Sequence, residues 1–165
     1  MTDAGVPSPA DVTKLMQSTV PMLGSMGLEA VVVEPRHVRT RLPFSAVNGN
    51  HIGTVYAGVL FSLLEASGGA LVLVSLDVSR WIPVIVEGTI RYLRPVSGSV
   101  DCDLSLTERD VEAVHAALDA DPKYRWTFQA SAVAEDGRVA CEADFVYRFR
   151  PAGTIQERVA RNPAP

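Results

Sequence analysis

In the second half of the chain, hydrophobic and polar residues alternate one by one, which is the pattern of a β-strand with one buried face. The alternation recurs in four long runs, which cover residues 84–93, 100–107, 124–132 and 139–150. Polar residues occupy one face of every run, as in an antiparallel sheet that covers a core with its other face. The prolines that bound these runs are Pro83, Pro95, Pro122 and Pro151. The pattern therefore predicts four strands of one antiparallel sheet.

The first half of the chain combines helical and strand patterns. Apolar residues recur at helical spacing over residues 11–23, where Asp11 is the expected N-cap. Shorter alternating runs predict two more strands, followed by a polar, glycine-rich loop and a long apolar helix. A short surface helix is expected between the second and third long strands. In chain order, these elements cover residues 29–34, 37–44, 45–54, 55–76 and 108–119.

This order of elements predicts the α+β class, with an antiparallel sheet wrapped around one apolar helix. That arrangement is the hotdog architecture, and it is favoured over a closed barrel because barrels fill their interior with side chains or a ligand. A length of 165 residues suits one domain. We expect the domain to span residues 10–152, with flexible tails at 1–9 and 153–165.

The apolar helix resembles a membrane span in length. Glu65 is its only charged residue, and it is also the only one between Leu42 and Leu76. A carboxylate at the centre of a span costs roughly 2.5–3.5 kcal/mol. The sequence therefore favours a helix that is buried on all sides within a soluble domain.

Composition narrows the function classes. The net charge is −4 and no run of Lys and Arg exceeds two residues, so nucleic-acid binding is not expected. Two cysteines are too few for a disulfide framework or a cysteine-based zinc site, and the three histidines have no metal-ligand spacing. The chain carries no serine-hydrolase or nucleotide-binding motif. Because no signal peptide is read at the N-terminus, a cytoplasmic location is expected.

One face of the predicted helix combines small residues with the single acid. The positions on this stripe are Gly58, Ser62, Glu65 and Gly69. Small residues let a ligand or a second chain approach closely, and a carboxylate in a dry site has a raised pKa. The alternative is a structural role, in which Glu65 caps a backbone group or pairs with Arg91 or Arg94.

The loop before the helix, Asn48–Thr54, brings amide side chains and an imidazole to a helix N-terminus. Free N–H groups there suit a polarised carbonyl oxygen. The alternative is a tight loop in which the asparagine side chains satisfy backbone groups.

The segment from Asn50 to Glu65 resembles the signature of the PaaI-like and 4-hydroxybenzoyl-CoA thioesterases of the hotdog superfamily. Ile90–Gly98 resembles the strand that follows in these proteins, and the whole similarity spans residues 28–150. The resemblance implies that Glu65 attacks the thioester or activates water and that Asn50 positions that water. It also implies that the backbone N–H groups of Ala57 and Gly58 polarise the thioester carbonyl.

This chain differs from that signature at two positions. Tyr56 stands where the family has a histidine, and Ala57 replaces the first of two glycines. A backbone N–H role tolerates the second change, and His51 is the only nearby imidazole. The residues expected to contact substrate are His51, Tyr56, Phe61, Ser62, Arg91 and Arg94. The apolar walls expected around an aromatic or medium-length aliphatic acyl group are Phe61, Leu64, Tyr92 and Phe128.

The leading hypothesis is an acyl-CoA thioesterase without a metal or other cofactor, in which coenzyme A is part of the substrate. The alternative is a hotdog protein that binds acyl-CoA or lipid without turnover. A hotdog dehydratase is less favoured because His51 is poorly placed to pair with Glu65. The resemblance further implies a homodimer or a dimer of dimers, with the site at a subunit interface and no membrane or nucleic-acid partner.

Overall fold

The computed structural model of the chain describes residues 6–161, except for the side chains of residues 158 and 159. The described residues form five helices and six strands. The six strands and the long central helix follow the predicted order, but the predicted N-terminal helix is divided in two and a C-terminal helix is added. Their bounds are α1 Pro9–Thr19, α2 Pro21–Ser25, β1 Glu29–Glu34, β2 His37–Leu42, α3 Ala57–Ser75, β3 Trp81–Tyr92, β4 Val100–Ser105, α4 Glu108–Ala120, β5 Arg125–Ala134, β6 Val139–Pro151 and α5 Ala152–Arg161.

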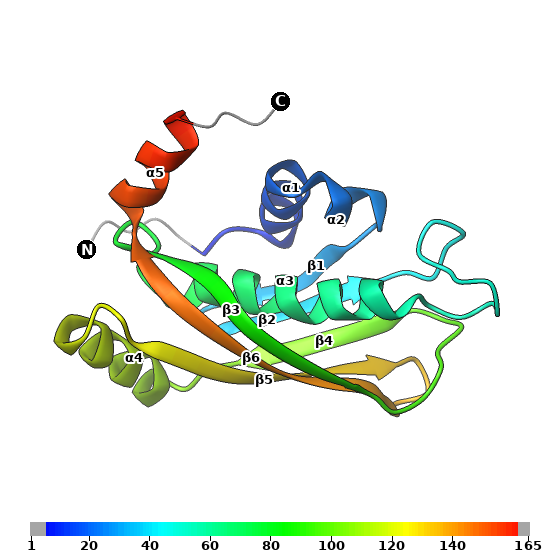
Figure 1. The fold of residues 1–165 in the computed structure, drawn as a ribbon. Helices are drawn as coiled ribbons and strands as arrows, with labels where there is room; N and C mark the ends of the chain where they lie inside the picture. The colour runs from blue at the N-terminus through cyan, green and yellow to red at the C-terminus, as the bar shows by residue number, and fades with distance from the viewer. Residues whose placement is uncertain (1–5, 162–165) are drawn as a thin grey trace.

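The strands form one antiparallel sheet in the order β1-β2-β4-β5-β6-β3. The sheet curves around α3, and α1 and α2 lie beside α3 over the β1 end of the sheet (Figure 1). This arrangement confirms the predicted α+β hotdog fold. Helix α4 connects β4 to β5 at one end of the sheet, away from α3's N-terminus.

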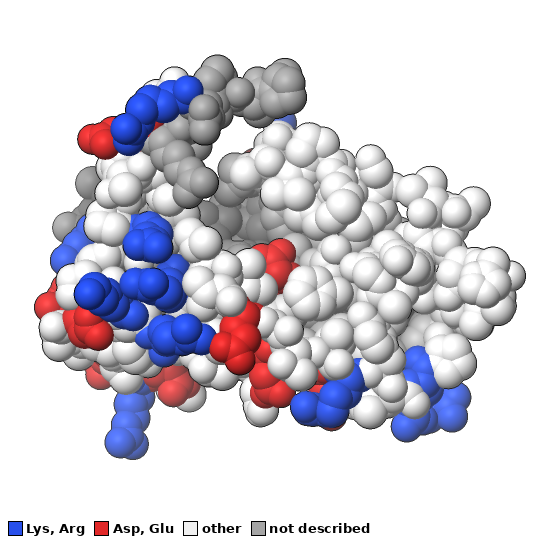
Figure 2. Space-filling model, in the orientation of Figure 1, with Lys and Arg blue, Asp and Glu red and all other residues white. Residues whose placement is uncertain are grey.

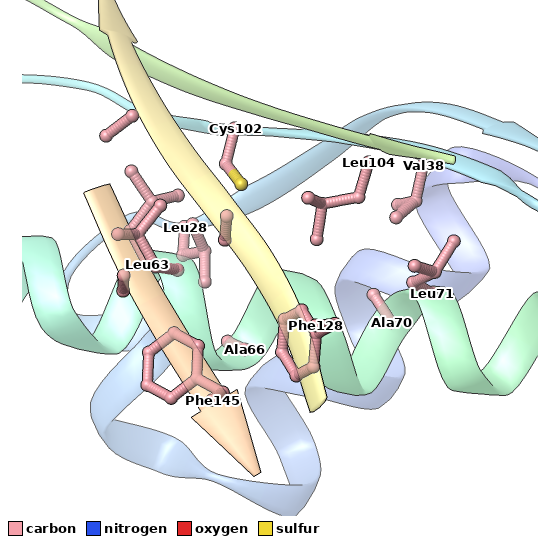
Figure 3. Close-up of a cluster of buried hydrophobic side chains, with 14 of the residues drawn as sticks. Leu28, Val38, Leu63, Ala66, Ala70, Leu71, Cys102, Leu104, Phe128 and Phe145 are labelled. Carbon is pink, nitrogen blue, oxygen red and sulfur yellow. The ribbon is translucent and has the colours of Figure 1, made fainter. Parts of the chain in front are cut away.

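The core lies between the inner face of the sheet and α3 (Figure 3). Phe128 and Phe145 stack with ring centroids 5.4 Å apart, and both cysteines are buried. Helix and sheet approach closely at Gly68, where an added Cβ would lie 2.1 Å from Phe128 Cζ. Glycine is therefore required at this position by packing.

Strand β3 departs from the predicted alternation. The sequence predicts Val84 and Val86 on the buried face, but a bulge between Ile85 and Glu87 shifts the register against β6. Both valines are exposed as a result. β3 lies at the edge of the sheet, where bulges and prolines are tolerated because one row of backbone groups faces outward. For the same reason Pro83, predicted to precede the strand, lies within it.

The ends of the domain differ from the prediction. Ser8 is the N-cap of α1, and Asp11, the expected cap, is instead the third helical residue and completes a capping box with Ser8. The helix ends at Thr19 because Pro21 begins α2. Residues 152–161 form α5 where the sequence predicts a flexible tail. The expected tail segments 1–5 and 162–165 lie outside the described residues.

Helix α3 is apolar all round but is buried mainly on the side that faces the sheet, contrary to the expectation of burial on all sides. Its length and composition would allow it to cross a membrane, whereas in this fold it is the core helix. Ser62, Glu65, Gly69 and Leu73 are only partly buried. These four residues lie on the side of α3 that does not pack against the sheet, and this side forms the floor of a groove.

Candidate functional site

Glu65 projects from the middle of α3 on the side turned away from the core. Among the side chains that the structure describes, which leave out those of residues 158 and 159, none forms a hydrogen bond or ion pair with the Glu65 carboxylate. The backbone carbonyl of Glu65 accepts a 3.1 Å hydrogen bond from Tyr147 Oη. Burial raises the pKa of the Glu65 carboxyl above its ordinary value. The suggested partner Arg91 instead pairs with Glu142 and Asp144 on β6. The structural interpretation of Glu65 as half of an ion pair therefore finds no partner among the described side chains.

The side chain of Glu65 lies in a groove of about 560 Å³. Helix α3 forms the floor of the groove, and α1 and α2 form one wall. Residues around the start of β3 line the end of the groove that is farthest from the N-terminus of α3. The residues that line it on these elements are Leu15, Met16, Thr19, Val20, Met22, Leu23, Ser62, Glu65, Ala66, Gly69, Ala70, Val72, Leu73, Val78, Ile82 and Pro83. On the face shown in Figure 2, the surface over α1 and α2 carries little charge, whereas charged side chains gather on α5 and along the β3 edge.

The walls of this groove are not the ones that the sequence predicts. Leu64 and Phe128 are buried in the core, and Phe61 packs edge-on against Phe145 with ring centroids 5.3 Å apart. Tyr92 lies at the N-terminal end of α3, where its Oη donates a 3.0 Å hydrogen bond to the Ala57 carbonyl. These apolar residues serve the fold, because they lie on the side of α3 that faces the sheet or at its first turn.

The loop before α3 is held by asparagine side chains, as its structural interpretation predicts. Asn50 Oδ1 accepts hydrogen bonds from the backbone N–H groups of Ile52 and Thr54, and its Nδ2 donates to Thr54 Oγ1. Asn48 is fully buried and donates to the carbonyls of Met26 and Pro43. The amide of Asn50 retains one N–H that is not used by these bonds.

The first turn of α3 presents free backbone donors. Tyr56 is the N-cap but provides no side-chain cap, so the N–H groups of Ala57 and Gly58 are among the four that a helix leaves without an internal acceptor. Both residues are exposed. The Tyr56 ring lies against Gly58, where an added Cβ would be 2.8 Å from Tyr56 Cε1. This turn can donate to a negative or polarised oxygen, with the helix dipole favouring it.

The structure divides the predicted site into two places. Asn50, Ala57 and Arg94 line a separate cavity of about 330 Å³ at the start of α3, whereas Ser62 and Glu65 line the groove. Glu65 follows Ala57 by eight residues, which is about 12 Å along a helix. One copy of the chain therefore does not bring the free N–H groups and the carboxylate into one cavity.

Three of the residues expected to contact substrate lie elsewhere. His51 is exposed in the loop, Phe61 belongs to the aromatic core contact, and Arg91 lies on the outer face of the sheet with its acidic partners. No cluster of three or more His, Cys, Asp or Glu side chains that could hold a metal ion lies among the described residues.

Sequence reasoning missed the contribution of the N-terminal helices. Met16 and Leu23 line the groove opposite α3, although nothing in their immediate sequence points to a site. The available signal is the apolar spacing along residues 11–23, which shows that this segment has an apolar face but not what the face covers.

The comparisons with known proteins agree with this fold. A family model described as a domain of unknown function (DUF4442) matches residues 9–148. The chain belongs to this family. A Pseudomonas aeruginosa protein of unknown function, described as a "probable thioesterase", is 33% identical with a TM-score of 0.81, over 88% of this chain and 98% of its own. No curated protein matches the chain significantly.

More distant members of the same fold class are thioesterases. A mutant thioesterase from P. aeruginosa is 14% identical with a TM-score of 0.70, over 90% of this chain and 97% of its own. A thioesterase from Haemophilus influenzae gives the same identity and TM-score, over 90% of this chain and 94% of its own. At this identity, these two similarities support the hotdog fold alone.

Proposed function

We propose that this protein is an acyl-CoA thioesterase, which hydrolyses a thioester to a carboxylic acid and coenzyme A. The observation that carries the proposal is the Glu65 carboxylate, which is partly buried in an apolar groove with a raised pKa and no partner among the side chains that the structure describes. A desolvated carboxylate is a stronger base and nucleophile than one in water. The resemblance of residues 50–65 to hotdog thioesterases and the description of the 33%-identical relative support the same activity.

In this mechanism, Glu65 either attacks the thioester carbonyl carbon or removes a proton from the attacking water. In the first route an acyl–Glu65 anhydride forms, the C–S bond breaks, and water then hydrolyses the anhydride. In the second route water adds directly and the thiolate of coenzyme A leaves. Both routes place negative charge on the carbonyl oxygen, which the free N–H groups of Ala57 and Gly58 can stabilise.

A second copy of the chain is part of this proposal. Because the helix N-terminus and Glu65 lie in different cavities of one copy, the donors at Ala57 and Gly58 would act on a substrate held by Glu65 of a partner. The edge strand β3 is the proposed contact. Its Val84 and Val86 are 38% and 44% exposed, and the unpaired backbone groups of an edge strand are a template for pairing with another strand.

The dimer has its own test. Light scattering at micromolar concentration is expected to give twice the monomer mass for the wild type, and Val86→Lys is expected to lower the mass and the thioesterase activity together. A fully active wild-type monomer would contradict the shared site.

The function is tested with a panel of acyl-CoA esters and a reagent that reports free thiol. The proposal predicts release of coenzyme A from at least one ester at a rate proportional to enzyme concentration. If esters bind, as measured by calorimetry, but no thiol is released, the protein is an acyl-CoA or lipid carrier. Two observations favour that second candidate. The Tyr56 ring lies against Gly58, and the side-chain amide of Asn50 already forms three hydrogen bonds within its own loop.

A further inference from the structure

The groove that holds Glu65 has an aliphatic lining apart from Thr19, Ser62 and Glu65 itself. Its apolar lining consists of Leu, Met, Val, Ile, Ala and Pro side chains, and none of the aromatic rings that the structure describes lines it. Two methionines, Met16 and Met22, come from α1 and α2, and the flexible methionine side chain adapts to apolar ligands of varying shape. A groove of about 560 Å³ lies within the range of small-molecule sites. The chemistry of the lining favours an alkyl chain over a flat aromatic acyl group.

The position of Glu65 fixes the direction in which such a chain would run. Towards the start of α3 the next lining residue is Ser62, which is polar, and beyond it lie the free N–H groups of the first turn. In the other direction the floor continues over Gly69 to Leu73, and the lining is apolar to its end at Val78 and Ile82. From Glu65 to Leu73 the helix rises about 12 Å, enough for an extended chain of roughly ten carbons.

Gly69 forms the middle of that floor, and the fold does not explain its presence. A Cβ at Gly69 would meet no atom within 4 Å, and glycine within a helix costs about 1 kcal/mol relative to alanine. Its neighbour Gly68 differs, because a Cβ there would collide with Phe128. The missing side chain at Gly69 therefore leaves open space in the groove, one helical turn beyond the carboxylate.

We propose that the groove between α1, α2 and α3 holds the alkyl chain of a medium-length aliphatic acyl thioester, and that Gly69 determines the chain length that fits. The inference rests on the proposed thioester substrate. The acyl carbonyl lies at Glu65, the chain passes over Gly69, and its end reaches Leu73 and Ile82. A side chain at position 69 would fill the groove beyond the first few carbons.

The test uses thioether analogues, S-butyl-CoA and S-decyl-CoA, which cannot be hydrolysed, so that binding is measured separately from turnover. By calorimetry, the wild type is expected to bind S-decyl-CoA at least tenfold more tightly than S-butyl-CoA. Gly69→Leu is expected to weaken S-decyl-CoA binding at least tenfold and S-butyl-CoA binding less than threefold. The matched control is Gly153→Leu, the same change at a helical glycine of α5 with open space around it, which should keep the wild-type preference. Circular dichroism verifies that both variants fold.

The outcomes separate the groove from the activity. If Gly69→Leu folds and keeps the wild-type preference for the decyl chain, the chain lies elsewhere and the inference is wrong, even if the enzyme hydrolyses acyl-CoA. If Gly69→Leu loses both ligands equally, Gly69 does not select chain length. If the decyl preference depends on Gly69 but no acyl-CoA ester is hydrolysed, the groove assignment stands and the proposed hydrolysis fails.

Discussion

Two adjacent glycines of α3 are expected to respond to the same substitution with opposite signs. A Cβ at Gly68 would lie 2.1 Å from Phe128 Cζ and 2.9 Å from Tyr147 Oη. The Phe128 ring cannot simply turn away, because it stacks on Trp126 and Phe145 at centroid distances of 5.3 and 5.4 Å. Overpacking of this kind costs about 1–3 kcal/mol, and occasionally more. The 2.1 Å approach places this site at the upper end of that range. Because alanine returns about 1 kcal/mol of helix propensity, Gly68→Ala should be destabilising by about 2 kcal/mol.

Gly69→Ala gains the same helix propensity without a collision, because a Cβ there meets nothing within 4 Å. The expected gain in unfolding free energy is about 0.5–1 kcal/mol. For a domain of this size, 1 kcal/mol moves Tm by about 2–4 °C, so Gly68→Ala should lower Tm by several degrees and Gly69→Ala should raise it by about 1–4 °C. Thermal unfolding followed by circular dichroism, at one protein concentration for all variants, measures both shifts. A stabilising Gly68→Ala, or equal shifts for the pair, would refute the packing of α3 against β5.

Three further outcomes follow from single contacts. Tyr147→Phe removes the hydrogen bond to the Glu65 carbonyl and should lower the unfolding free energy in urea by about 1 kcal/mol; an unchanged midpoint would argue against that contact. Hydrogen bonds to Glu34, the larger cause, and to Asp103 raise the pKa of His37. The free energy of unfolding that protonated His37 contributes is therefore greatest below the ordinary histidine pKa, and it is lost as pH rises through the raised pKa. His37→Ala should therefore destabilise the protein at pH 5.5 and have little effect at pH 9, as measured by urea midpoints. Because burial raises the pKa of Glu65, kcat/KM should rise with pH through a value above that of an ordinary glutamate, and an acid limb at the ordinary value would contradict a desolvated base.

The sequence predicted most of the fold because alternation reports one-sided burial directly. It failed where an apolar residue has another reason to be present. Val84 and Val86 look like core residues, but the bulge after Ile85 leaves them exposed on the edge strand. A single sequence does not distinguish an apolar sheet edge from an apolar sheet face. The cap of α1 was misplaced because Asp11 is a good cap in isolation, while Ser8 and Pro9 together form a better helix start.

The candidate site was predictable to the extent that it depends on local pattern. Glu65 stood out because a charge in a long apolar run has a cost that the fold alone does not explain. The groove walls were not predictable for two reasons. The aromatic side chains near Glu65 in the sequence pack against the sheet, and Met16, which does line the groove, belongs to a helix about fifty residues earlier in the chain. That pairing depends on tertiary packing, which periodicity does not encode.

The central claim is that the Glu65 carboxylate is the nucleophile or general base of thioester hydrolysis, and one variant tests it. Glu65→Gln keeps the size and hydrogen bonding of the side chain but removes the base or nucleophile, so kcat on the best acyl-CoA ester should fall at least about 100-fold. Because the folded-state pKa of Glu65 is raised, its ionised form costs stability above that pKa, and Glu65→Gln should be at least as stable as the wild type at pH 8.

The measurement is kcat and KM for coenzyme A release by the wild type, Glu65→Gln and the control Glu112→Gln, which removes an exposed acid on α4. The account predicts a fall in kcat of at least about 100-fold in Glu65→Gln and none in Glu112→Gln. The dissociation constants of the thioether analogues should stay within a few-fold of the wild-type values. Full activity in a folded Glu65→Gln protein would contradict it.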